Sequence, residues 1–221
     1  MLRSLSDIRS IEAVISPNRI ATYSKSLGTP NARRALNLYA WNAQVSGAFM
    51  LPQQLCEVSI RNAVSEVLTV VYGSQWPWDS TFEGSLPNPG VGFNMRRELI
   101  KTRSMVTRGN TDKLIPELKF VFWGKMFTKR FDGRLWQPHI SRAFSGLPGS
   151  RTPKQCRSMI FNELEHVRQL RNRIAHHEPI FQRNLHSDFN RMLTLIRWRC
   201  PKTAAWLSQI ETVTATLIAR P

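Results

Sequence analysis

Apolar residues recur along this chain at helical spacing, and sustained alternation of apolar and polar residues, the pattern of a strand, is absent. Prolines, glycines and capping residues separate the apolar runs. We therefore expect an all-α fold. The expected helices lie within 1–16, 17–27, 31–51, 52–72, 94–106, 120–127, 135–146, 153–177, 189–196 and 206–217.

Several helix boundaries follow from backbone chemistry. Pro52 lacks an amide donor and clashes with the preceding turn, so we expect a break or kink there. Ser16 before Pro17 is typical of an N-cap followed by proline at the first helical position, and the segment 29–31 opens the next, longer helix. Thr152 and Gln155 form a capping box at the start of the helix that leads into 167–181, the stretch richest in titratable and charged side chains suited to chemistry.

Helical spacing also predicts which faces are buried. The predicted apolar face of 52–72 contains Cys56, Ile60, Ala63, Val67, Val70 and Val71, and a later one contains Trp206, Ile210, Val213 and Leu217. Glu57 and Arg61 flank the first face four residues apart, as structural partners in a surface ion pair. Four glycines, three prolines and two tryptophans make 73–93 a packed loop rather than a linker. We therefore expect one domain over 1–221.

The charge balance points to a polyanionic partner. Lys and Arg number 31 against 15 Asp and Glu, a formal net charge of +16, which favours nucleic acid over an anionic membrane surface. No apolar run is long enough to span a bilayer, and the N-terminal stretch lacks the apolar segment of a signal peptide. The three cysteines are far apart without CxxC pairing, which fits a reducing cytoplasm.

Groups suited to chemistry are densest in 167–181, VRQLRNRIAHHEPIF. On a helical wheel, the apolar stripe of this helix contains Ile160, Leu164, Val167 and Ile174. Arg171 falls inside that stripe, within about 25° of its centre. Because a guanidinium is always charged, a core-facing position is costly unless the group is paired or faces a wet surface. Arg171 is therefore either a functional residue or one half of a structural salt bridge to Glu57 or Glu66.

The two histidines follow at the end of this helix. Pro179 disfavours α geometry at the preceding residue, so the helix should end at or just before His177. His176 lies four residues after Asn172, which can orient its imidazole, but about 140° from Arg171 on an ideal helix. An active site made from both residues would need a distorted last turn or a second chain. The ordinary alternative is that the helix dipole favours histidine at this end.

Other chemistries have weaker support. His166, His176, His177 and His186 lack the spacing of a metal site, and adjacent histidines on a helix diverge. We expect no metal or other cofactor. A serine or cysteine nucleophile paired with these histidines stays open, although no motif marks one.

The run from Arg171 to His176, RNRIAH, is an R-x4-H motif with a polar residue after the arginine, and it resembles the motif of HEPN-domain ribonucleases. The wider run LRNRIAHHEPIF is similar to the Abi-like (abortive infection) family of that superfamily. The runs ALNLYAWN at 35–42 and FWG at 122–124, the helix with Glu57, Arg61 and Asn62, and the Trp206 segment also resemble the family pattern. The resemblance covers most of the chain.

This resemblance implies a HEPN-like helical bundle, here with additional N-terminal helices, that forms a homodimer and brings two motifs together in a basic cleft. It implies metal-independent RNA cleavage by a toxin of phage defence, with a neutralising antitoxin as a further partner. His176 would be the general acid or base, and Arg171 would stabilise charge on the phosphate. The other implied site residues are Asn172, His177 and Glu178 in support, and Arg168, Arg173, Arg96 and Arg97 as RNA contacts.

Two alternatives remain open at this level. The chain is a non-catalytic RNA-binding or regulatory module, or it is an interaction protein in which Arg171 only holds a dimer together.

Overall fold

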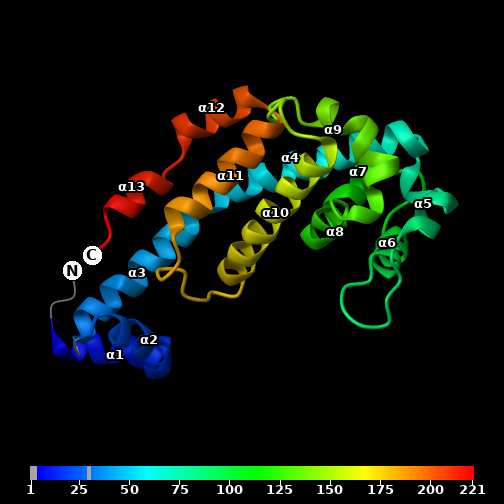
Figure 1. The fold of residues 1–221 in the computed structure, drawn as a ribbon. Coiled ribbons are helices and arrows are strands. Elements are labelled where there is room, and N and C mark those ends of the chain that lie inside the picture. Colours follow the sequence, from blue (N-terminus) through cyan, green and yellow to red (C-terminus); the bar gives the residue numbers. More distant parts are fainter. Residues whose placement is uncertain (1–3, 29–30) are drawn as a thin grey trace.

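The chain folds into helices joined by short turns and loops (Figure 1). The structure, a computed structural model, describes residues 4–28 and 31–221, and within these ranges it contains no strand, so the predicted all-α fold is confirmed. The first six α-helices are α1 (Leu5–Ile15), α2 (Pro17–Ser26), α3 (Ala32–Ala48), α4 (Met50–Tyr72), α5 (Ser80–Ser85) and α6 (Met95–Arg103). The others are α7 (Thr111–Leu114), α8 (Phe120–Lys125), α9 (Gln137–Ala143), α10 (Pro153–Ala175), α11 (Leu185–Arg199), α12 (Pro201–Ile210) and α13 (Val213–Ile218).

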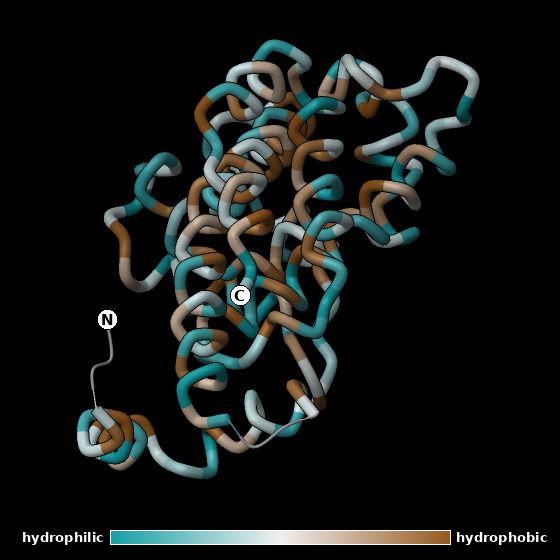
Figure 2. Tube along the Cα trace, turned by 90° about the vertical axis from the view of Figure 1, so that its left-hand side faces the viewer, coloured by the Kyte–Doolittle hydropathy of each residue, from teal (hydrophilic) through white to brown (hydrophobic). Residues whose placement is uncertain are grey.

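The long helices form the body of the molecule. Helix α11 packs against α4, α10 and α12, while α13 returns to α3. At one end α2 packs against α3 and α1 packs against α2, and at the opposite end lie α5 and α6 (Figure 1). Hydropathy alternates along each long helix in Figure 2, as an amphipathic helix requires. The buried hydrophobic side chains belong to one cluster that runs from Ile8 to Val213.

The break predicted near Pro52 is present. Helix α3 ends at Ala48 and α4 begins at Met50, so Phe49 alone separates them, and Pro52 lies in the first turn of α4. Proline is tolerated there because the first turn has no intrahelical acceptor for its missing N–H. Helix α4 ends where predicted, at Gly73 with φ +82°.

The segment 73–93 is packed rather than extended. Trp76 is fully buried, and its indole N–H donates to the hydroxyl of Ser65 on α4 at 3.2 Å. Glu83 of α5 forms ion pairs with Arg96 and Arg103 of α6. The prediction of a packed loop is therefore confirmed, with the addition of the short helix α5.

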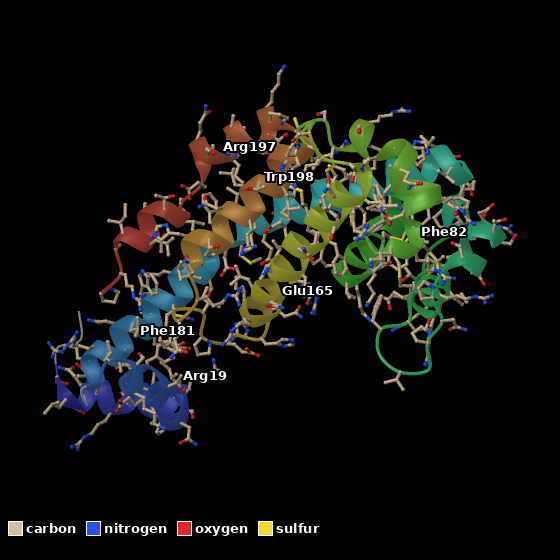
Figure 3. The ribbon with its side chains drawn as sticks, viewed as in Figure 1. Arg19, Phe82, Glu165, Phe181, Arg197 and Trp198 are labelled. Carbon is tan, nitrogen blue, oxygen red and sulfur yellow. The ribbon has the colours of Figure 1, made fainter. Side chains whose placement is uncertain are left out.

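Gly146, in the connection from α9 to α10, allows that connection to approach α11 closely. Its N–H donates to the carbonyl of Trp198 at 2.9 Å, and a Cβ at this position would lie 2.2 Å from the carbonyl oxygen of Arg197. Figure 3 labels Arg197 and Trp198 on this part of α11. The backbone contact explains why a residue without a side chain stands here.

Two predicted apolar faces are buried only in part. Val70 of α4 is 51% exposed, and Trp206 and Ile210 of α12 are 50% and 39% exposed. Helix α12 packs against α11 through Ala204 and Leu207 instead. A helical wheel predicts which side of a helix is apolar, but the position of the neighbouring helix determines how much of that side is buried.

Two further predictions are corrected in detail. Ser16 is the N-cap of α2 and Pro17 is its first residue, as predicted, but the Ser16 side chain makes no capping hydrogen bond, because its backbone is at φ +91°. Glu57 and Arg61 are half-buried, and among the described residues neither forms an ion pair. Before α9, Asp132–Trp136 forms a π-helical turn that leads into this helix. For the helix predicted to open at 29–31, Asn31 caps α3, while Thr29 and Pro30 lie outside the described residues.

Within the described ranges, no helix is both long enough and apolar enough to cross a membrane.

Candidate functional site

The helix that carries the RNRIAHHEP segment begins as predicted. The Thr152 hydroxyl accepts the Gln155 N–H at 3.3 Å, and the Thr152 N–H donates to the Gln155 side chain at 2.9 Å, which completes the capping box. The buried face of α10 contains Cys156, Arg157, Ile160, Leu164, Val167 and Leu170. Helix α10 thereby carries the segment to the end of the molecule where α2 and α3 lie (Figure 1).

Arg171 lies at the edge of that face and is half-buried. Across residues 4–28 and 31–221 it has no hydrogen bond or ion pair of its side chain. Among the described residues, the salt bridge from Arg171 to Glu57 or Glu66 is absent. Glu66 instead pairs with Arg199 at 2.5 Å. A half-buried guanidinium without an acceptor is set up to bind an anion.

The fully buried arginine of α10 is a different residue. Arg157 is 6% exposed, and its guanidinium donates to the carboxylate of Asp132 at 2.8 Å and to the carbonyl of Phe127 at 3.3 Å. The π-helical turn places Asp132 beside α10. Arg157 is thus the structural arginine of this helix.

Helix α10 is regular up to its C-cap and ends in a left-handed turn. His176 is the C-cap, and His177 follows with φ +54°. The His177 N–H donates to the carbonyl of Ile174 at 3.0 Å, and the Glu178 N–H donates to that of Arg173 at 2.8 Å. These two bonds form a Schellman motif, in which the left-handed position is usually glycine. The predicted end of the helix near His177 is confirmed, and the turn rotates His177 away from the regular helical direction.

Contacts from other elements hold this turn. The guanidinium of Arg19 on α2 donates to the carbonyl of His177 at 2.7 Å, and Arg173 donates to the carbonyl of Pro179 at 2.9 Å. The buried side-chain oxygen of Asn42 on α3 accepts the N–H groups of Ile180 at 2.8 Å and Phe181 at 3.1 Å. Two helices distant in sequence, α2 and α3, therefore hold the end of the motif and the residues after it, and Arg173 adds a bond from within the motif. Figure 3 shows Arg19 and Phe181 at this meeting point.

These elements line an open cavity of about 490 Å³, which we call the motif cavity. Its lining comes from α2, α3, the start of α4 and the end of α10. The lining residues that carry polar side chains are Arg19, Tyr23, Tyr39, Asn42, Ser46, Gln53, Arg171, His177 and Glu178. His176 does not line the motif cavity, whereas His177 does; both histidines are solvent-exposed at the helix end. The structure therefore brings Arg171 together with His177 and Glu178, and it leaves His176 outside.

The charge of the motif cavity is positive. Arg19 and Arg171 contribute two guanidinium groups, while the single carboxylate, that of Glu178, lies 3.5 Å from the guanidinium of Arg173. Burial, and next the neighbouring Tyr39, raise the pKa of Tyr23 to about 12, so its hydroxyl stays neutral. This arrangement suits an anionic ligand such as a phosphate group.

The remaining predicted residues are mostly engaged locally. The side chain of Asn172 makes no hydrogen bond to His176; only the Asn172 carbonyl accepts the His176 N–H, at 2.9 Å. Arg168 pairs with Glu165 at 2.5 Å, and this hydrogen bond lowers the pKa of the Glu165 carboxyl. Arg96 pairs with Glu83 as described above. Arg97 is exposed and makes no ion pair within the described part of the chain.

Arg19, Asn42 and Gln53 line the motif cavity, although the sequence predicts no role for them. Asn42 belongs to the run ALNLYAWN and is buried on α3. A buried amide needs hydrogen-bond partners, so a prediction that this position is buried would have indicated a role for Asn42. Nothing in the sequence around Arg19 or Gln53 marks them. Their place depends on how α2 and α4 pack against the end of α10.

No three or more His, Cys, Asp or Glu side chains are arranged to hold a metal ion in the parts of the chain that the structure describes. Comparison with protein-family models, with curated proteins and with solved structures finds no match for this chain.

Proposed function

We propose that this protein is a metal-independent endoribonuclease of the HEPN type that acts in the cytoplasm as a toxin of abortive infection. The observation that carries the proposal is Arg171: a half-buried guanidinium without an acceptor among the described residues, on the wall of a positive cavity that His177 also lines. The net charge of +16 supports a polyanionic substrate. The resemblance of RNRIAHHEP to the Abi-like family supplies the type of reaction and the role in phage defence.

The chemistry is an internal transesterification of RNA. A neutral imidazole takes the proton of the ribose 2′-OH, and the 2′-oxygen forms a bond to the adjacent phosphorus. The bond from phosphorus to the 5′-oxygen breaks, and that oxygen receives a proton from an imidazolium. Arg171 stabilises the negative charge on the phosphoryl oxygens in the transition state. DNA lacks the attacking hydroxyl, so RNA is the substrate.

Two histidines compete for the role of general base. The resemblance assigns it to His176, whereas His177 shares the motif cavity with Arg171. In a homodimer, the exposed His176 of one copy is available to the Arg171 of the other, which is how the resemblance implies that the site is completed. A neutralising partner would act by covering this surface.

The direct test is incubation of the purified protein with RNA in EDTA. We expect cleavage by the wild type, and a loss of about 10²-fold or more for Arg171→Ala and for the substitution to alanine of the catalytic histidine, His176 or His177. His166→Ala is the matched control, because His166 is an exposed histidine of the same helix outside the motif cavity. Equal rates for the wild type and all four variants would show that the catalytic assignment is wrong.

A second candidate function is RNA binding without cleavage, and the position of His176 outside the motif cavity favours it. It predicts RNA affinity that falls steeply with salt and no cleavage products. If Arg171→Ala instead dissociates a dimer and leaves RNA affinity unchanged, the chain is an interaction protein and Arg171 has a structural role.

A further inference from the structure

The motif cavity contains a polar group that the protein leaves without a partner. The side-chain oxygen of Gln53, on the first turns of α4, is buried and makes no hydrogen bond within the described residues. A buried polar atom without a partner costs about 1–3 kcal/mol. Gln53 lines the motif cavity, so rotation of its side-chain amide about the last bond can turn this oxygen toward a ligand there, which then supplies the missing hydrogen bond.

One wall of the same cavity is a braced aromatic ring. Tyr39 is half-buried, and Tyr23 packs edge-on against it with ring centroids 5.4 Å apart. Tyr23 in turn packs against Phe181 at 4.9 Å. Tyr39 is therefore held in place, and it contributes an aromatic ring to the lining, against which a planar ring can pack.

The cationic groups lie on the same cavity. Arg171 has no acceptor in the described ranges, and Arg19 uses one of its guanidinium nitrogens on the His177 carbonyl. One lining thus combines an aromatic face, an amide without a partner and a free guanidinium. These are the groups that recognise the base and the phosphate of a nucleotide.

We propose that the motif cavity binds one unstacked nucleotide, with its base against Tyr39 and hydrogen-bonded to Gln53, and with its phosphate at Arg171. A volume of about 490 Å³ is in the range of small-ligand pockets. That the nucleotide belongs to an RNA strand rests on the function proposed above; a free mononucleotide offers the same chemistry. A base held in a duplex cannot enter the cavity, so the substrate class is single-stranded RNA.

Fluorescence anisotropy with labelled oligonucleotides tests this. We expect single-stranded RNA to bind at least tenfold more tightly than the same sequence in a duplex, with unequal affinities for the four homopolymers. Gln53→Met keeps the side-chain volume but removes the amide, and it should weaken binding of the preferred homopolymer about tenfold and level the ranking of the bases. Tyr39→Leu should weaken binding of all four homopolymers, by about tenfold.

Gln54→Met is the matched control, because Gln54 is the exposed neighbour of Gln53 outside the cavity. Thermal melting followed by circular dichroism should show that Gln53→Met does not lower stability, since it removes a group without a partner. The proposal is overturned if RNA binds but Gln53→Met and Tyr39→Leu bind it as the wild type does; the proposed function survives that result. If the wild type binds adenosine monophosphate or another free mononucleotide in a Gln53-dependent way but no RNA, the cavity assignment stands and the proposed function fails.

Discussion

Asn42 is the residue through which α3 fixes the backbone that follows the motif, and its removal makes a sharp prediction. Its side-chain oxygen accepts two backbone N–H groups, those of Ile180 and Phe181. Both residues are at most 2% exposed, so neither donor can turn to bulk water. Asn42→Ala leaves both donors without an acceptor.

The magnitude follows from the two lost hydrogen bonds. Each buried donor left unsatisfied costs about 1–3 kcal/mol, so the substitution should lower the free energy of unfolding by roughly 2–6 kcal/mol. The helix propensity of alanine offsets this by about 0.5 kcal/mol. Asn37→Ala is the matched control, because Asn37 is an exposed asparagine of the same helix. Asn37→Ala gains helix propensity but loses neither of the two hydrogen bonds.

Urea denaturation of the wild type and both variants measures the difference. Amide hydrogen exchange adds a local readout, because the N–H groups of Ile180 and Phe181 should lose protection in Asn42→Ala and keep it in Asn37→Ala. If Asn42→Ala is no less stable than Asn37→Ala, or if both amides stay protected, Asn42 does not hold this segment.

Three further predictions follow. Arg157→Met should lower the free energy of unfolding by about 3–5 kcal/mol in urea titrations, because it leaves the Asp132 carboxylate unpaired, and adding Asp132→Leu should recover part of the loss. The hydrogen bond from Arg103 lowers the pKa of the Glu83 carboxyl below its usual 4.5, so the ion pair stabilises the fold fully above pH 4.5 and this stabilisation is lost as the pH falls through the lower pKa of the folded state. In thermal melts across this range, Glu83→Gln should be less stable than the wild type above pH 4.5 and should match it below the folded-state pKa. His177→Gly should raise stability by about 0.5–1 kcal/mol, since glycine relieves the φ of +54°, whereas an equal gain in His177→Ala would contradict this reason.

The end of α10 shows how far the sequence predicts the candidate site. The capping box and the proline at 179 are local signals, and both boundaries of the helix lie where those signals predict. On the helical wheel, Arg171 is the arginine that falls within the apolar stripe, and the burial of Arg157 was not predicted. The partner of Arg157 is Asp132, which lies in a π-helical turn twenty-five residues earlier. A wheel describes one helix, so it cannot show which neighbouring element carries the matching charge.

The all-α class, the break between α3 and α4, the packed tryptophan loop and both ends of α10 can be predicted from the amino-acid sequence alone. These features depend on interactions between residues a few positions apart: capping, proline geometry and apolar periodicity. That His177 rather than His176 lines one cavity with Arg171, and that Arg19, Asn42 and Gln53 line it too, becomes visible only in the folded chain. Those contacts join residues as much as 158 positions apart, and the packing of α2, α3 and α4 around a left-handed turn creates them.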